Sequence, residues 1–143
     1  MNPVIFHLAF PVTDIAQTKE FYAKGLGCVV GRETPSALIL NLCGHQLVAH
    51  VTREVLTPQK TIYPRHFGLI FTSVAEWEAL LLRAKQNNLR FREEAKHRFV
   101  GQLTEHRTFF LEDPFHNLLE FKYYSHPEAI FGANAFAHVG DSV

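Results

Sequence analysis

The sequence repeats itself at an interval of 59 residues, counted from His7 to His66. The segment HLAFPVTDIAQTKEFYAKGL aligns without a gap onto HFGLIFTSVAEWEALLLRAK. Each copy opens with a histidine and runs through the alternation of side chains that is typical of a strand. Each then reaches a capping pattern, Asp14 with Gln17 or Ser73 with Glu76, that marks the start of a helix. Since a repeat organises a whole fold, it predicts two units of the same kind.

The remaining residues predict further strands after each helix. For the first half we expect a strand at about 4–12, a helix at 14–24 and strands near 27–33, 36–42 and 45–52. For the second half we expect a strand at about 65–72, a helix at 73–87 and strands near 89–93, 98–101, 106–112 and 118–124. The chain therefore divides into a module at about 4–53, a module at about 65–124 and an irregular or partly ordered tail at 125–143, all within one domain, 1–143.

Neither module covers both faces of its own sheet, so the two are expected to pair. The composition, 47% hydrophobic and 20% charged over 143 residues, is typical of a soluble globular domain with one hydrophobic core. The predicted fold is α+β: two βαβββ modules form a curved, roughly eight-stranded mixed sheet. It is an open, barrel-like cup with its helices on the outside.

Three polar side chains are predicted to point into this cup. In each strand the alternate apolar residues face the helices, which leaves His7, His66 and Glu120 on the opposite face. The neighbouring residues Ala9 and Gly68 are small and leave room for a ligand.

Two imidazoles and a carboxylate on one face predict a metal site. Taken singly, each is an ordinary surface or hydrogen-bonded residue, and the chain has nine histidines. The coincidence of all three favours a ligand set, because a buried carboxylate needs a compensating charge. One divalent ion is expected at His7, His66 and Glu120, with Fe(II) favoured and Mn, Zn, Ni or Co as alternatives.

The sequence resembles the vicinal oxygen chelate superfamily, which includes glyoxalase I, bleomycin-resistance proteins, fosfomycin thiol transferases and extradiol ring-cleaving dioxygenases. The resemblance spans about residues 4–124 and rests on FHLAFPVTDIAQTKEFYAKGLG, RHFGLIF and FFLEDPFHNLLEF. In the last motif Asp113 and Pro114 make a turn, Asn117 closes it and Glu120 takes the ligand position. The resemblance implies a metal-dependent enzyme, and the complete ligand set argues against a pure drug sequestrant.

The resemblance leaves three functions open. Glyoxalase I commonly adds a Glu ligand on the fourth strand of its first half, where this chain offers Gln46, Val48 and His50 to the cup. The absence of this carboxylate favours a dioxygenase-like enzyme. If Gln46 or His50 is a ligand in its place, the protein is a glyoxalase-type lyase or isomerase, or a thiol transferase. One difference counts against the dioxygenase: extradiol enzymes usually carry a Tyr at the position of Phe110, so the Tyr hydroxyl is missing in this chain. The third function is a small-molecule-binding protein of the bleomycin-resistance type.

Further residues are assigned to the site, each against the alternative of a polar rim residue without a chemical role. Two histidines are predicted to act as catalytic acids or bases. The resemblance to extradiol enzymes points to His50, and the predicted position on the inner face of the cup points to His106. Gln46, Arg107, Phe110 and Lys122 are predicted to bind substrate, the two cations by recognising an anionic group.

The charge balance excludes several partners. Lys+Arg and Asp+Glu number 14 each, so no strong field attracts nucleic acid or a membrane surface. The two cysteines lie outside any CxxC pair, which is typical of a protein of the reducing cytoplasm. The resemblance implies a homodimer, with each cup built by one chain or from exchanged modules.

Overall fold

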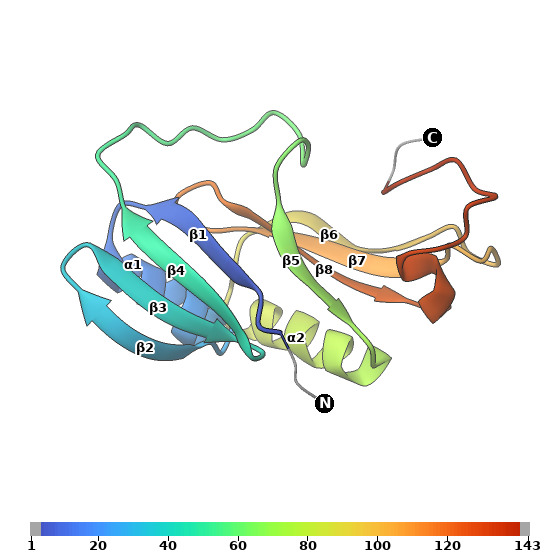
Figure 1. The fold of residues 1–143 in the computed structure, drawn as a ribbon, viewed down its shortest axis with the longest axis horizontal. Coiled ribbons are helices and arrows are strands. Elements are labelled where there is room, and N and C mark those ends of the chain that lie inside the picture. Colours follow the sequence, from blue (N-terminus) through green and yellow to red (C-terminus); the bar gives the residue numbers. More distant parts are fainter. Residues whose placement is uncertain (1–3, 141–143) are drawn as a thin grey trace.

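The computed structural model describes residues 4–140 and shows two four-stranded sheets side by side (Figure 1). The first contains β1 His7–Val12, β2 Val29–Thr34, β3 Ala37–Leu42 and β4 His45–Val51, in the order β1-β4-β3-β2. The second contains β5 Phe67–Phe71, β6 Phe91–Arg98, β7 His106–Glu112 and β8 Leu118–Tyr124, in the order β5-β8-β7-β6. In each sheet the first strand of the module pairs in parallel with the last. The predicted α+β class and the two βαβββ modules are confirmed.

The two sheets do not join into one. β1 and β5 are both edge strands, and they approach through side chains such as Phe10 and Phe67, whose ring centroids lie 5.6 Å apart. Among the described residues no backbone ladder connects them. The expected eight-stranded sheet is therefore two sheets of four strands, because apolar packing, and not strand pairing, holds the modules together.

Helices cover one side of the sheets, as the repeat predicts (Figure 1). α1 Ile15–Thr18 continues as a π-helix, η1 Lys19–Gly25, where the sequence predicts a single helix. α2 Val74–Gln86 lies against the second sheet. The predicted caps are present: Asp14 accepts from the Gln17 amide at 2.7 Å and Ser73 from the Glu76 amide at 3.3 Å.

The hydrophobic core lies between the helices and the sheets. Trp77 of α2 is buried and its indole N–H donates to the Phe121 carbonyl at 2.8 Å. Phe109 packs against Trp77 and Phe121, with centroid distances of 5.5 and 5.4 Å. This packing fixes the helix-facing side of β7 and β8, so their alternate residues must face away from α2.

One prediction for the second half is corrected. The strands expected near 89–93 and 98–101 are one strand, β6, which two register irregularities bend. Over its described residues, 125–140, the tail forms a 3₁₀ turn, η2 Pro127–Ile130, and His138 returns to Thr104 beside the second sheet. No helix of the described chain has the length and apolarity needed to cross a membrane.

Candidate metal centre

The centre of the candidate site is a contact between His66 and Glu120. His66 directly precedes β5 and Glu120 lies on β8, and their Nε2 and Oε1 atoms are 3.1 Å apart. The other ring nitrogen of His66, Nδ1, lies 2.8 Å from the carbonyl oxygen of Ile62 in the linker. An imidazole with an acceptor at each nitrogen needs a positive charge, either a second proton or a metal ion at Nε2. Without metal, the bond to Glu120 raises the pKa of His66.

Glu120 is buried, with 5% of its surface exposed. Besides His66, it accepts a hydrogen bond from Thr108 Oγ1 at 2.6 Å and lies 3.7 Å from Lys122 Nζ. Burial alone would raise the pKa of Glu120, but the hydrogen bond from His66, the charge of Lys122 and the Thr108 hydroxyl together lower it. The carboxylate is therefore held ionised, as a metal ligand must be.

The third predicted ligand, His7, lies on the other sheet. It is exposed on β1, and its Nδ1 is 2.7 Å from Oε1 of Gln46 on β4, its partner in the strand ladder. Since the amide oxygen accepts only, Nδ1–H of His7 donates to it and Nε2 is left as a lone pair. This is the way in which a ligating histidine is commonly oriented by a neighbour.

The three predicted ligands do not meet within one chain. In the part of the chain that the structure describes, no group of three His, Cys, Asp or Glu side chains is placed to hold a metal ion. The three-residue ligand set stays a prediction, since the chain brings together His66 and Glu120 and leaves His7 with Gln46. The reason is that the two sheets lie side by side and do not close over each other.

Gly68 has a different role from the one predicted. A Cβ at this position would lie 1.6 Å from the backbone oxygen of Glu120, its partner in the β5–β8 ladder. The missing side chain therefore allows close contact between β5 and β8, and leaves no space for a ligand. Ala9, by contrast, lies on an exposed face.

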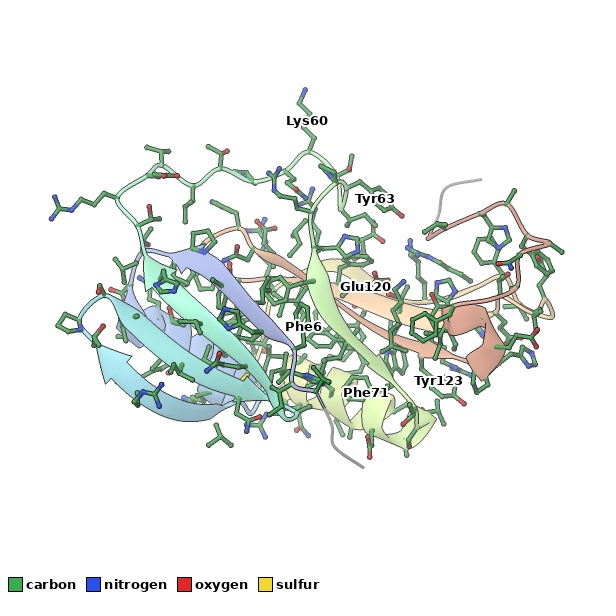
Figure 2. The ribbon with its side chains drawn as sticks, viewed as in Figure 1. Phe6, Lys60, Tyr63, Phe71, Glu120 and Tyr123 are labelled. Carbon is green, nitrogen blue, oxygen red and sulfur yellow. The ribbon has the colours of Figure 1, made fainter. Side chains whose placement is uncertain are left out.

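Phe110 and Lys122 lie beside the His66–Glu120 pair. The Phe110 ring is almost fully buried and meets the His66 ring edge-on at 5.0 Å. Figure 2 labels Glu120 of β8 and Tyr63 of the linker on the side of the second sheet away from α2.

Hydrogen bonds attach the linker to β6. Arg92 of β6 donates to the carbonyl oxygens of Gln59 and Lys60 at 2.9 and 2.8 Å.

The predicted acid–base histidines lie on different sheets. His50 is exposed on β4, opposite Pro11 of β1 and Ala37 of β3. His106 is buried at the start of β7, with Nδ1 3.0 Å from the Thr104 carbonyl. Burial lowers the pKa of His106, and the nearby charges of Lys122 and Arg98 lower it further, so the ring is neutral.

Arg107 does not face the predicted cup. It lies on the helix side of the second sheet, in a groove that it shares with Trp77, Glu78 and His97. The alternation of side chains along β7 explains this position. Arg107 lies between His106 and Thr108, which both face away from α2, so Arg107 faces α2.

Thr108 and the Ile62 carbonyl are site groups to which the sequence alone assigns no role. Alternation places Thr108 on the inner face, and the turn between β7 and β8 sets a register in which Thr108 pairs with Lys122 and Phe110 with Glu120. A diagonal contact from Thr108 to Glu120 follows from that register. The Ile62 carbonyl lies in the linker, where no periodic pattern exists to place it.

Comparison with known proteins identifies the family. Residues 4–121 match the model of the Glyoxalase/Bleomycin resistance protein/Dioxygenase superfamily. A glyoxalase/bleomycin resistance protein/dioxygenase from Alicyclobacillus acidocaldarius is 39% identical, with a TM-score of 0.84 over 90% of this chain and 96% of that one. Among curated proteins, none matches this sequence.

Two further solved structures share the fold at low identity. One is a mutant of the genomically encoded fosfomycin resistance protein FosX from Listeria monocytogenes, complexed with Mn(II) and 1S,2S-dihydroxypropylphosphonic acid. It is 16% identical, with a TM-score of 0.64 over 90% of this chain and 95% of that one. The other is lactoylglutathione lyase from Agrobacterium tumefaciens, 15% identical with a TM-score of 0.64 over 85% and 94%. On the family match and the 39% identical relative, this chain belongs to the glyoxalase/bleomycin resistance protein/dioxygenase superfamily.

Proposed function

We propose that this protein is a metal-dependent enzyme that acts on a small substrate with two neighbouring oxygen atoms. The observation that carries the proposal is the His66–Glu120 pair, in which one imidazole has an acceptor at both nitrogens and the buried carboxylate is kept ionised. A divalent ion at Nε2 of His66 and at the Glu120 carboxylate supplies the charge that the proton supplies in its absence. FosX, a protein of the same fold, binds Mn(II) together with a dihydroxy compound.

The third ligand in this proposal is His7 of a second copy of the chain. His7 is exposed, and the contact of its Nδ1 with Gln46 leaves Nε2 as the ring nitrogen that would bind the ion. A two-fold pair of chains places the first sheet of each copy over the second sheet of the other, so that one dimer has two equivalent sites. The homodimer and the sharing of modules, which the sequence left open, are supported by the separation of His7 from the other two ligands within one chain.

The chain's own residues supply most of the chemistry at such a site. Together with His7 of a second copy, His66 and Glu120 would hold a divalent ion, which would supply Lewis-acid chemistry to the two neighbouring oxygens of the substrate. Lys122, 3.7 Å from Glu120, faces the charge that develops on those oxygens. Thr108 holds Glu120 in place, and the Phe110 ring packs edge-on against His66. The acid–base roles of His50 and His106 stay predictions.

A dioxygenase-like reaction remains the leading choice. The ladder places Gln46, an amide, beside His7, so the first sheet adds no carboxylate to the ligand set. Two histidines and one carboxylate with open positions are typical of non-haem Fe(II) oxygenases. A glyoxalase-type lyase or isomerase, or a thiol transferase, is the alternative, and a metal-free binding protein is the third.

The test is the metal content of protein purified anaerobically without a histidine tag, by mass spectrometry. We expect about one ion per chain in the wild type and in Glu94→Ala, an exposed control on β6, and less than a tenth of that in Glu120→Gln. Iron or manganese, with oxygen uptake on catechols, supports the dioxygenase. Nickel or zinc, with turnover of hemithioacetals, supports the lyase. A wild type that takes up no metal on titration contradicts the enzyme and leaves a binding protein.

A further inference from the structure

The end of the linker closes on itself just before His66. The side chain of Gln59 holds both groups of one peptide unit: its Oε1 accepts from the Arg65 amide at 3.1 Å, and its Nε2 donates to the Arg65 carbonyl at 2.9 Å. We call residues 59–65 the linker loop. Ile62, in the middle of the loop, is buried, and its carbonyl oxygen is the group that lies 2.8 Å from Nδ1 of His66.

An arginine on the second sheet holds this loop from outside. Nη2 of Arg92 donates to the carbonyl oxygens of Gln59 and Lys60 at 2.9 and 2.8 Å. Its other terminal nitrogen, Nη1, lies 3.7 Å from Oε1 of Glu112, whose side chain is buried on β7. A guanidinium group is planar and presents several donors at fixed angles, so one Arg92 side chain can contact the carboxylate and the loop together.

The position of the loop matters for the ring of His66. A histidine that binds a metal ion through one nitrogen is commonly oriented by a hydrogen bond at the other. In this chain the acceptor is the Ile62 carbonyl, which belongs to irregular backbone and not to a strand or helix. The place of that carbonyl therefore depends on the side chains that hold the loop, Gln59 from within and Arg92 from the sheet.

We propose that Arg92 is a positioning residue of the metal centre. By binding two carbonyls of the linker loop, it keeps the Ile62 carbonyl against Nδ1 of His66 and so directs Nε2 of His66 toward Glu120 and the ion. The inference rests on the proposed function for its link to metal, whereas the hold on the His66 ring is a property of the metal-free protein.

Arg90 provides a matched control for Arg92. Its Nε also lies 3.7 Å from Oε1 of Glu112, but among the described residues it makes no hydrogen bond to the linker loop. Arg92→Met and Arg90→Met thus remove the same charge from Glu112, and only the first removes donors from the loop. Arg92→Lys restores a donor that can reach a carbonyl.

The first readout is the ring of His66 in metal-free, full-length protein labelled with ¹⁵N-histidine. The Nδ1 resonance of His66, assigned by its absence in His66→Gln, is expected to move in Arg92→Met, to stay in place in Arg90→Met and to return toward the wild-type position in Arg92→Lys. A merely structural role for Arg92 would lower the melting temperature without moving this resonance.

The second readout is Mn(II) affinity, measured from the electron paramagnetic resonance signal of the free ion. Loss of a partner that orients a ligand typically weakens metal binding about 10–100-fold. We expect about tenfold weaker binding by Arg92→Met, because Gln59 still closes the loop, and wild-type binding by Arg90→Met. If Arg92→Met does not fold, Gln59→Leu opens the loop from within and should move the same His66 resonance.

A His66 resonance that stays in place in folded Arg92→Met, or in Gln59→Leu where that variant replaces it, overturns the proposal. So does a resonance that moves equally in Arg90→Met. If the wild type binds no Mn(II), the proposed function fails by itself, and the resonance of the metal-free protein still decides whether Arg92 orients the His66 ring.

Discussion

At the scale of single residues, the proton on His66 couples stability to pH in metal-free protein. The unfolded pKa of a histidine is about 6.5, and contact with Glu120 raises the folded pKa of His66. The stabilisation is therefore complete below about pH 6.5 and is lost as the pH rises through the folded pKa. Glu120, whose folded pKa is lowered, adds stabilisation above about pH 4.5 that is lost as the pH falls through its folded pKa.

We expect the melting temperature of metal-free protein to fall as the pH rises above about 6.5 and through the raised pKa of His66, and to fall less in His66→Gln. Metal binding needs a neutral His66, so the added stabilisation by a divalent ion should increase over the same pH range. Calorimetric melts with and without the ion check both slopes. A wild type and His66→Gln with the same slope would show that this proton is not linked to folding.

Tyr22 gives a second residue-scale prediction. Its buried hydroxyl donates to Oδ2 of Asp113 at 2.7 Å, and Asp113 in turn accepts from the amides of Phe115 and Asn117. Burial raises the pKa of Asp113, so the carboxylate depends on these donors. Tyr22→Phe should lower the free energy of unfolding by about 1–2 kcal/mol in urea titrations. Tyr123→Phe, a half-buried control, should change it by less than about 0.5 kcal/mol.

At the scale of elements, the β5–β8 pair depends on Gly68. A methyl group there would meet backbone, which cannot turn aside as a side chain can. Gly68→Ala should therefore separate the two strands, lower the free energy of unfolding by about 3 kcal/mol or more, and reduce metal uptake along with it. Gly31→Ala is the control, since its new methyl group would meet chiefly the Ile39 side chain, at 3.2 Å. If Gly68→Ala melts and binds metal like the wild type, β5 and β8 tolerate a wider spacing.

At the scale of the whole molecule, a shared site predicts complementation between two inactive variants. His7→Ala and Glu120→Gln each remove one ligand, and each alone should bind no metal. In a heterodimer of the two, one site is intact and the other lacks both ligands. A refolded equal mixture should thus recover about a quarter of the wild-type metal, because half of its dimers are heterodimers with one site of two.

The measurement is metal content of the mixture after unfolding and refolding together, compared with the two variants refolded apart. Recovery in the mixture only is the expected result. If the mixture binds no more metal than the two variants refolded apart, the chains do not share ligands. A monomeric wild type in analytical ultracentrifugation would contradict the dimer directly.

What the sequence determined by itself is local and periodic. The repeat, the caps at Asp14 and Ser73 and the alternation of side chains depend on spacing along the chain, and they correctly predict two βαβββ modules. The same alternation places Glu120 with Thr108, and, applied consistently, it would have placed Arg107 on the helix side.

Only the tertiary structure decided how distant segments meet. The modules pack through apolar side chains with no periodic signature, so their relative position, and with it the separation of His7 from His66, could not be predicted from the chain. The Ile62 carbonyl at His66 and the return of His138 to Thr104 are contacts of irregular segments. Such contacts depend on the path of the whole chain in space, because no local pattern fixes where a loop or tail returns to a sheet.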